Sequence, residues 1–146
     1  MQINTKIRYG LRTMIELASS TEPKGLLQKE IAKSQNISLK YLDPIILALK
    51  VKGLIANSKG KGSGYLLTRP AEEITMYDIY TAFEQITITE CINNCNLCER
   101  TVHDCHAKNY WIGFKEQFCL LLKEKNLAQI VKDTYYECNE QKIEVE

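Results

Sequence analysis

Apolar residues recur at helical spacing along much of the chain and predict a mainly helical protein. Residues 5–19 and 38–53 each carry an apolar stripe opposite charged residues, and residues 28–35 form a shorter helix between them. Ser38 suits the N-cap of the third helix and Gly53 suits its C-terminal end. The stripes consist of Ile7, Leu11, Met14, Ile15 and Ala18, of Ile31 and Ala32, and of Leu42, Ile45, Ile46 and Leu49.

Two short strands are predicted after the third helix. Residues 54–57 and 65–68 are mostly apolar, and the loop between them is rich in glycine and lysine, which is typical of a hairpin tip. Thr75 and Asp78 are spaced like a capping box that begins a further helix. Pro44 removes a backbone hydrogen bond inside the third helix and predicts a local distortion there.

The C-terminal half contains a polar segment followed by a long helix. Residues 88–105 are too polar and irregular for a regular element, and Asp104 is a candidate N-cap for an amphipathic run that continues to about Lys125. Residues 126–133 predict a short final helix. The long run has a heptad-like seam of Trp111, Phe114, Phe118 and Leu121.

The order of these elements predicts the fold class. A helix, a short helix, a longer helix and a two-stranded hairpin make up a winged helix-turn-helix, mainly α with a small β-hairpin. We expect a long C-terminal dimerisation helix after it. The expected divisions are residues 1–87 for the winged helix-turn-helix, 88–105 for a cysteine-rich cluster loop, 106–134 for the dimerisation helix and short final helix, and 135–146 for an acidic tail.

The composition places the chain among ordinary globular proteins, with 146 residues of which 45% are hydrophobic and 25% charged. No apolar run is long enough to span a membrane, and the N-terminus lacks the features of a secretory signal. We therefore expect a cytoplasmic protein without a membrane partner. Clustered cysteines in that compartment more often bind metal or change redox state than form structural disulfides.

Positive charge is concentrated in the first half of the chain. Residues 1–70 hold twelve Lys and Arg against four Asp and Glu, whereas residues 71–146 hold seven against fourteen. The net charges are therefore +8 and −7. This asymmetry indicates that the first half faces a polyanion, which for a winged helix is double-stranded DNA.

The candidate DNA contacts follow from the geometry of a winged helix. Its recognition helix enters the major groove, its hairpin reaches along the backbone, and its first helix can contact the flanking phosphates. The candidates are Ser38, Lys40 and Tyr41 at the start of the recognition helix, Lys59 and Lys61 at the wing tip, and Arg8 and Arg12 on the first helix.

Four of the six cysteines fall within fifteen residues; of the two histidines of the chain, His103 lies among them and His106 follows directly. Cys95 and Cys98 form a Cys-x-x-Cys pair, which is the tightest chelating spacing in the segment. Cys105 falls at the predicted start of the long helix, where unpaired backbone N–H groups favour a thiolate or an anionic cluster. The candidate ligands are Cys91, Cys95, Cys98 and Cys105, followed by His106 and His103.

Several blocks of the sequence resemble the IscR/NsrR/CymR family (Rrf-type) of bacterial transcription regulators. They are K-I-R-Y-G-L-R-T-M-I-E-L-A, I-S-L-K-Y-L-D-P-I-I-L-A-L-K-V-K-G-L-I, G-K-G-S-G-Y-L-L-T-R-P, E-E-I-T-M-Y-D-I-Y-T-A-F-E and C-E-R-T-V-H-D-C-H-A-K-N-Y-W. The resemblance spans about residues 1–125. It implies a homodimeric winged-helix regulator whose long C-terminal helix forms much of the dimer interface. Members with a cysteine cluster before that helix typically bind an iron–sulfur cluster and sense iron–sulfur status, nitric oxide or redox state.

The resemblance also assigns individual roles on the DNA side. Lys59 stands where many members place a wing arginine that enters the minor groove. Tyr41 matches the recognition-helix tyrosine of the family, and Asp43 replaces the more usual glutamate.

The cysteine segment departs from the family pattern. Cluster-binding relatives usually supply three cysteines at slightly closer spacing and a histidine three residues after the last one, and some nitric-oxide sensors use an acidic residue of the first helix instead. Here Lys108 stands at the histidine position and Arg8 at the acidic one. Cys95 is additional and is the leading candidate for a fourth ligand.

All-cysteine ligation suits either a 2Fe–2S or a 4Fe–4S cluster. The sequence thus predicts a DNA-binding transcription regulator that senses iron–sulfur, redox or nitric-oxide status through such a cluster. A thiol/disulfide switch and a zinc site of Cys₄ or Cys₃His type are the alternatives, since both use the same side chains. Enzyme activity is not expected, because the Cys-x-x-Cys pair lacks a βαβ context and no nucleotide-binding or nucleophile motif is present.

Overall fold

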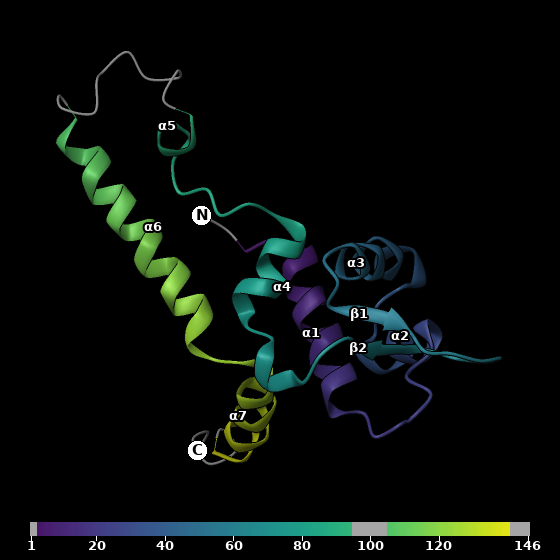
Figure 1. The fold of residues 1–146 in the computed structure, drawn as a ribbon. Helices are drawn as coiled ribbons and strands as arrows, with labels where there is room; N and C mark the ends of the chain where they lie inside the picture. The colour runs from purple at the N-terminus through teal and green to yellow at the C-terminus, as the bar shows by residue number, and fades with distance from the viewer. Residues whose placement is uncertain (1–2, 95–104, 141–146) are drawn as a thin grey trace.

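The computed structural model describes residues 3–94 and 105–140, the last seven of these by their backbone alone. The predicted fold class is confirmed (Figure 1). In chain order the elements are α1 (Thr5–Ser19), α2 (Gln28–Gln35), α3 (Leu39–Val51), β1 (Ile55–Asn57), β2 (Tyr65–Leu67), the 3₁₀ turn η1 (Ala71–Glu73), α4 (Met76–Phe83), α5 (Glu90–Asn93), α6 (His106–Glu124) and α7 (Leu127–Glu140).

Local capping fixes where the first helices begin. The Asn4 side chain accepts a 2.9 Å hydrogen bond from the backbone N–H of Ile7, and Ser38 caps α3 by accepting from the N–H of Tyr41. Asn36, in the left-handed conformation with φ of 51°, ends α2 and turns the chain into α3. Helical geometry is continuous through Pro44. The core between these helices consists of Met14, Leu17, Ile31, Ala32, Ile37, Leu42, Ile45, Ile46, Leu49, Leu54, Ile55, Ile74, Ile79 and Leu127.

The wing is anchored to the loop between α1 and α2. Its strands pair antiparallel with Ile55 opposite Leu67, and Leu26 adds an isolated bridge to Tyr65. A Cβ atom at Gly64 would lie 2.3 Å from the backbone of Leu26, so only glycine lets the two segments pass this closely. The wing base is therefore fastened to the chain that leads into α2.

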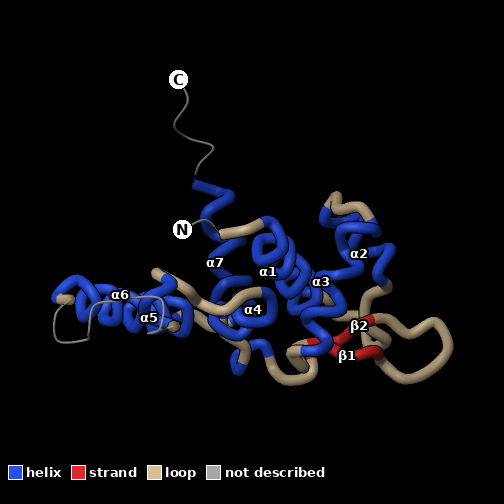
Figure 2. Tube along the Cα trace, turned by 90° about the horizontal axis from the view of Figure 1, so that it is seen from above, coloured by secondary structure: helices blue, strands red, loops and turns tan. Residues whose placement is uncertain are grey.

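α6 leaves the winged-helix body and extends away from it, so that α5 and α6 lie at one end of the molecule and the wing at the other (Figure 2). Its C-terminal half packs on α4 through a second apolar cluster of Ile7, Tyr80, Ile86 and Leu122. The rings of Tyr80 and Phe118 meet edge to face at 6.0 Å. Burial, with a smaller contribution from the Glu84 carboxylate, raises the pKa of Tyr80.

Three local expectations were wrong. The polar segment contains a short helix, α5, whose Ile92 lines a groove against α6. Cys105, not Asp104, occupies the N-cap position of α6. The final helix runs to Glu140, beyond the predicted end at residue 133, and tertiary contacts hold its start.

Those contacts fasten the start of α7 to the winged-helix core. The backbone N–H of Leu127 donates a 2.7 Å hydrogen bond to the carbonyl oxygen of Ile74, and the Leu127 side chain is fully buried in the main core. Asn126 and Gln129 exchange hydrogen bonds of 2.9 Å between side chain and backbone. α7 then packs along α1, as Figure 2 shows.

Candidate DNA interface and cysteine site

The start of α3 presents exposed side chains where a recognition helix meets DNA. Lys40 and Tyr41 are exposed, Tyr41 by 65%. Ser38 is exposed as well, although its hydroxyl oxygen also caps the helix. These three predicted residues therefore lie together on one turn.

Gln28 of α2 also contacts this turn, which the sequence did not indicate. The Gln28 side-chain amide donates a hydrogen bond to the Asp43 carboxylate, which fixes the orientation of Asp43 on the exposed side of α3. An oriented carboxylate accepts hydrogen bonds from the amino group of cytosine in the major groove. No local pattern connects positions fifteen residues apart on different helices, so only the structure could reveal this pair.

The wing tip exposes the other predicted lysines. Lys59 and Lys61 are exposed on the loop between β1 and β2. Gly60 between them has φ of +106°, a conformation that side chains disfavour and that lets this loop turn tightly. The two lysine ammonium groups therefore lie at the tip of the hairpin, on either side of a glycine that leaves the backbone unobstructed.

The two arginines of α1 differ in what they contact. Arg8 is exposed. The Arg12 Nε donates a 3.0 Å hydrogen bond to Gln35 Oε1, its guanidinium also bonds the Gln35 carbonyl oxygen, and it lies 5.5 Å from the centre of the Tyr9 ring. Arg12 therefore connects α1 to the end of α2, and its contact with DNA stays a prediction.

The structure describes two of the four clustered cysteines. Cys91 lies in α5, half-buried, with its Sγ 3.4 Å from the Thr89 hydroxyl, and Cys105 is half-buried at the N-cap of α6. Cys95, Cys98 and His103 lie outside the described residues. Within the described part of the chain, Cys91, Cys105 and Cys119 are free thiols, and no three Cys, His, Asp or Glu side chains come together as metal ligands. The predicted ligand set therefore stays a prediction.

The first turn of α6 contains a buried cation. Lys108 is only 7% exposed, and its backbone N–H donates a 3.1 Å hydrogen bond to the carbonyl oxygen of Cys105. Lysine is almost never buried to this extent in proteins unless it is paired, and Lys108 has an interaction partner in this structure. His106 on the same turn is exposed, so its side chain is open to solvent in this structure.

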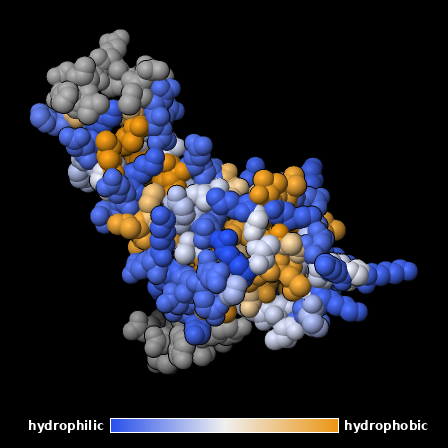
Figure 3. Space-filling view, viewed as in Figure 1, coloured by the Kyte–Doolittle hydropathy of each residue, from blue (hydrophilic) through white to orange (hydrophobic). Residues whose placement is uncertain are grey.

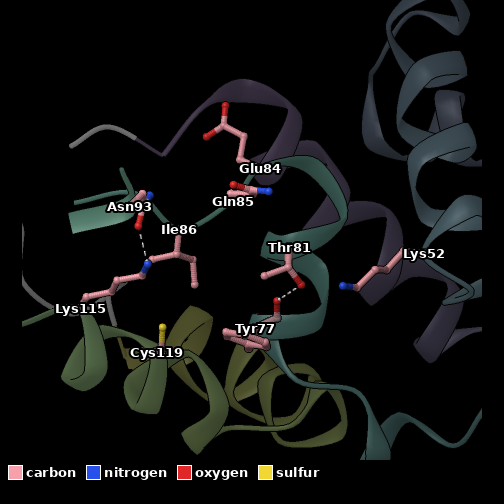
Figure 4. Close-up of a pocket in the computed structure, with 9 residues that line it drawn as sticks. All are labelled: Lys52, Tyr77, Thr81, Glu84, Gln85, Ile86, Asn93, Lys115 and Cys119. Atoms are coloured by element: carbon pink, nitrogen blue, oxygen red, sulfur yellow. Dashed lines mark hydrogen bonds between the residues drawn. The ribbon is translucent and has the colours of Figure 1, made fainter. Parts of the chain in front are cut away.

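A cavity of about 390 Å³ lies between the DNA-binding body and the α5–α6 arm (Figure 4). On the α6 side, the Lys115 ammonium lies 2.7 Å from the Asn93 side-chain oxygen of α5, and Cys119 points toward the opening. On the body side, the Thr81 hydroxyl donates to the Tyr77 carbonyl oxygen at 2.8 Å. Lys52, the C-cap residue of α3, also lines this space.

α6 exposes several large apolar side chains (Figure 3). Such a patch on a helix that leaves the body marks an interaction surface. The exposed residues are Tyr110, Trp111, Phe114, Leu120 and Leu121, and they include three of the four predicted seam residues. Separately, no helix in the described ranges is both long and apolar enough to cross a lipid bilayer.

The helix order, the wing and the exposed recognition turn define a winged-helix DNA-binding transcription regulator. The sequence model of the Rrf2 family, described as an iron-dependent transcriptional regulator, matches residues 3–133. The chain belongs to the Rrf2 family, and the relatives described below are transcription regulators and not enzymes.

Two curated relatives illustrate the match. The protein named Rrf2 of Nitratidesulfovibrio vulgaris is 30% identical over 134 residues, which cover 91% of this chain and 89% of the relative. The regulator IscR of Serratia proteamaculans is 29% identical over 136 residues, covering 91% and 80%.

Solved structures show the same architecture. IscR of T. potens is 25% identical with a TM-score of 0.71 over 100% of this chain and 93% of that one. CymR of B. subtilis, the global cysteine regulator of that organism, is 26% identical with a TM-score of 0.70 over 90% and 97%. An oxidized form of Staphylococcus aureus CymR is 31% identical with a TM-score of 0.66 over 90% and 96%.

Proposed function

We propose that this regulator acts as a homodimer whose affinity for its DNA operator is set by an iron–sulfur cluster held by Cys91, Cys95, Cys98 and Cys105. The observation that carries the proposal is the position of the cysteine segment. It joins α5 to α6, and α6 is the arm that connects an exposed apolar surface to the winged-helix core. A chemical change in this segment would therefore affect the N-terminal end of α6.

The chemistry of the available donors fits the cluster. Cys91 and Cys105 are free, half-buried thiols on two helices that pack together, and the sequence supplies two further thiols between them. Thiolates are the usual ligands of 2Fe–2S and 4Fe–4S clusters. When bound, the cluster supplies a centre that exchanges electrons or is dismantled by oxidants. The iron-dependence in the family's description and the IscR relatives support this choice.

The arm offers a route from the cysteines to the DNA. Phe118 and Leu122 of α6 pack against Tyr80 of α4, and α4 packs on both α1 and α3. A shift of α6 would therefore move α4 and alter the distance between the two recognition helices of a dimer. That distance decides affinity for two-fold related half-sites, so the two sites are coupled energetically.

A second copy of the chain is the proposed partner for the exposed face of α6. Tyr110, Phe114 and Leu121 follow one another at spacings of four and seven residues and lie on one side of the helix. Two such helices can bury their seams against each other around a two-fold axis. The arrangement would also place two winged helices on one DNA duplex.

The test is anaerobic purification of the full chain, followed by iron and sulfide analysis, a UV–visible spectrum, and binding to an operator selected from random duplexes. Stoichiometric iron and sulfide, with operator affinity that changes on cluster oxidation, are expected. Colourless protein without iron and sulfide that binds DNA equally with and without reductant contradicts the proposal.

A thiol/disulfide switch without metal is the second candidate function. The solved oxidized form of a CymR relative favours it, as does the Cys95–Cys98 spacing. Metal-free protein whose DNA affinity responds to a thiol reductant would establish this alternative, whereas stoichiometric zinc would indicate a structural metal site.

A further inference from the structure

The turn between α1 and α2 lies against the base of the wing. The carbonyl oxygen of Lys24 accepts a 2.8 Å hydrogen bond from the backbone N–H of Gly64 and a 2.6 Å hydrogen bond from the Ser58 hydroxyl. Two residues farther along, Leu26 and Tyr65 exchange backbone hydrogen bonds of 3.1 and 2.8 Å. This part of the turn therefore runs beside β2 as a third segment of the wing.

Ser58 is the residue at which the wing loop begins. Its backbone N–H donates a 2.9 Å hydrogen bond to the carbonyl oxygen of Gly64, which closes the hairpin below the loop that carries Lys59 and Lys61. Because the Ser58 hydroxyl also bonds the Lys24 carbonyl oxygen, one residue joins the loop to the turn. Lys24 therefore lies beside the root of the loop that bears the two predicted DNA-binding lysines.

The Lys24 side chain is available to an external anion. It is exposed, and its ammonium is not paired with any group among the described residues. Lys50 differs, because its ammonium bonds Asn57 at 2.8 Å and lies 5.7 Å from the centre of the Tyr65 ring. Glu22 is the acidic residue of the same turn, and the turn and the wing loop together carry three lysines against this one carboxylate. The surface at the wing base is therefore positively charged.

The anion that suits this surface is a phosphate of the DNA backbone. Duplex DNA carries one negative charge per about 1.7 Å of helix axis, so neighbouring cations can each meet a phosphate. Lys59 and Lys61 flank a glycine in an open loop, whereas two hydrogen bonds fix the backbone of Lys24. Binding at Lys24 therefore orders only a side chain, which lowers the cost in conformational entropy.

We propose that Lys24 binds a backbone phosphate of the DNA at the base of the wing, and that Ser58 positions it by holding its carbonyl oxygen. The contact is independent of base sequence, because phosphate contacts carry no sequence information. The inference rests on the proposed contact of the wing with DNA, and it does not depend on the cysteine-held cluster. Ser58 is a positioning residue, since it acts on the DNA through Lys24.

The experiment measures how binding to a short fluorescent duplex of mixed sequence depends on salt, by fluorescence anisotropy of the full-length protein. Wild type is compared with Lys24→Gln, Lys24→Arg, Lys59→Gln, Ser58→Ala, the double variant Lys24→Gln/Ser58→Ala, and Lys132→Gln. Lys132→Gln is the matched control, because it removes an exposed lysine of α7. Thermal melts of every variant show that the fold is retained.

Lys24→Gln should lower the affinity and reduce the slope of log affinity against log salt by about 1. Between about 50 and 200 mM salt, wild type then loses roughly 3.5-fold more affinity than this variant. Lys24→Arg and Lys132→Gln should keep the wild-type slope. Ser58→Ala should lower the affinity in the wild-type background and have no effect in the Lys24→Gln background, a pattern that a merely structural role would not produce.

Equal affinity and slope in wild type and Lys24→Gln overturn the inference. If Lys59→Gln still reduces the slope in that case, the wing contacts DNA and only the turn is excluded. If neither variant changes the slope, the wing itself is excluded, and the inference with it. An equal loss from Ser58→Ala in both backgrounds, or none in either, overturns the positioning role of Ser58. Protein without iron and sulfide would contradict the proposed function while leaving this comparison valid.

Discussion

The backbone N–H of Leu127 donates a 2.7 Å hydrogen bond to the carbonyl oxygen of Ile74, and this pair fixes the joint between α6 and α7 on the winged-helix core. Leu127 is fully buried, whereas α6 extends from this joint away from the body (Figure 1). α6 is thus a helix held firmly at its C-terminal end and bearing the cysteine segment at its N-terminal end. In the proposed mechanism, a local change at the cysteines reaches the DNA-binding elements through this arm.

Replacing Gly64 with alanine should loosen the wing. The added Cβ would overlap the backbone of Leu26, which cannot move away as a side-chain tip can. We expect a loss of about 1–3 kcal/mol in unfolding free energy, as for other overpacked sites, measured by urea denaturation. The neighbouring Ser63→Ala change is the control, and equal stability of the two variants would contradict the close approach.

Removing the buried hydroxyl of Thr13 should not lower the free energy of unfolding. Its Oγ1 finds no hydrogen-bond partner among the described residues, so Thr13→Val removes an unsatisfied polar atom. We expect unchanged or increased stability, by up to about 1 kcal/mol. Thr81→Val should instead lose about 1 kcal/mol, because the Thr81 hydroxyl bonds the Tyr77 carbonyl oxygen. Thermal melts of the two valine variants decide between these outcomes.

Replacing Lys59 with glutamine should weaken DNA binding without affecting assembly. Removing one phosphate contact lowers the affinity for all sequences and reduces the slope of log affinity against log salt by about 1. Fluorescence anisotropy across a salt series measures this slope. Lys132→Gln, an exposed change on α7, should leave it intact. An unaltered slope in Lys59→Gln would remove the wing tip from the interface.

Replacing Phe114 with glutamate should dissociate the proposed dimer. The ring is 41% exposed in one protomer, and burying both rings contributes about 3 kcal/mol or more, or roughly a 100-fold change in dissociation constant. Sedimentation velocity at several concentrations checks the result. Glu116→Gln changes an exposed polar residue of the same helix and should remain dimeric. A dimeric Phe114→Glu protein would place the interface elsewhere.

Replacing Cys95 with serine tests the fourth ligand. If Cys95 completes an all-cysteine site, the variant should lose the cluster or show an altered spectrum after anaerobic reconstitution. Cys119→Ser serves as the control, because Cys119 lies in the middle of α6 and lines the groove facing α5. Full retention of cluster and spectrum in the Cys95 variant would point to a histidine or to an external ligand.

Much of the fold was predictable because its determinants are local. The apolar stripes marked α1 to α4 and α6, Ser38 marked the start of α3, and the glycine-rich loop marked the wing. The candidate DNA residues Lys40, Tyr41, Lys59 and Lys61 were chosen from the same local patterns; the structure leaves all four exposed, and their contact with DNA stays a prediction. The Gln28–Asp43 pair and the engagement of Arg12 with Gln35 were not, because they join different helices.

The sequence by itself determined that the chain is a winged helix followed by a cysteine segment and an amphipathic helix, since periodicity, capping and cysteine spacing are properties of neighbouring residues. Only the tertiary structure decided that α7 belongs to the winged-helix core, that α6 extends from it as an arm, and that Lys108 is buried. The physical reason is that burial depends on which distant surfaces meet. From the sequence alone a lysine is expected to be solvated, and only the fold shows that Lys108 is shielded from water.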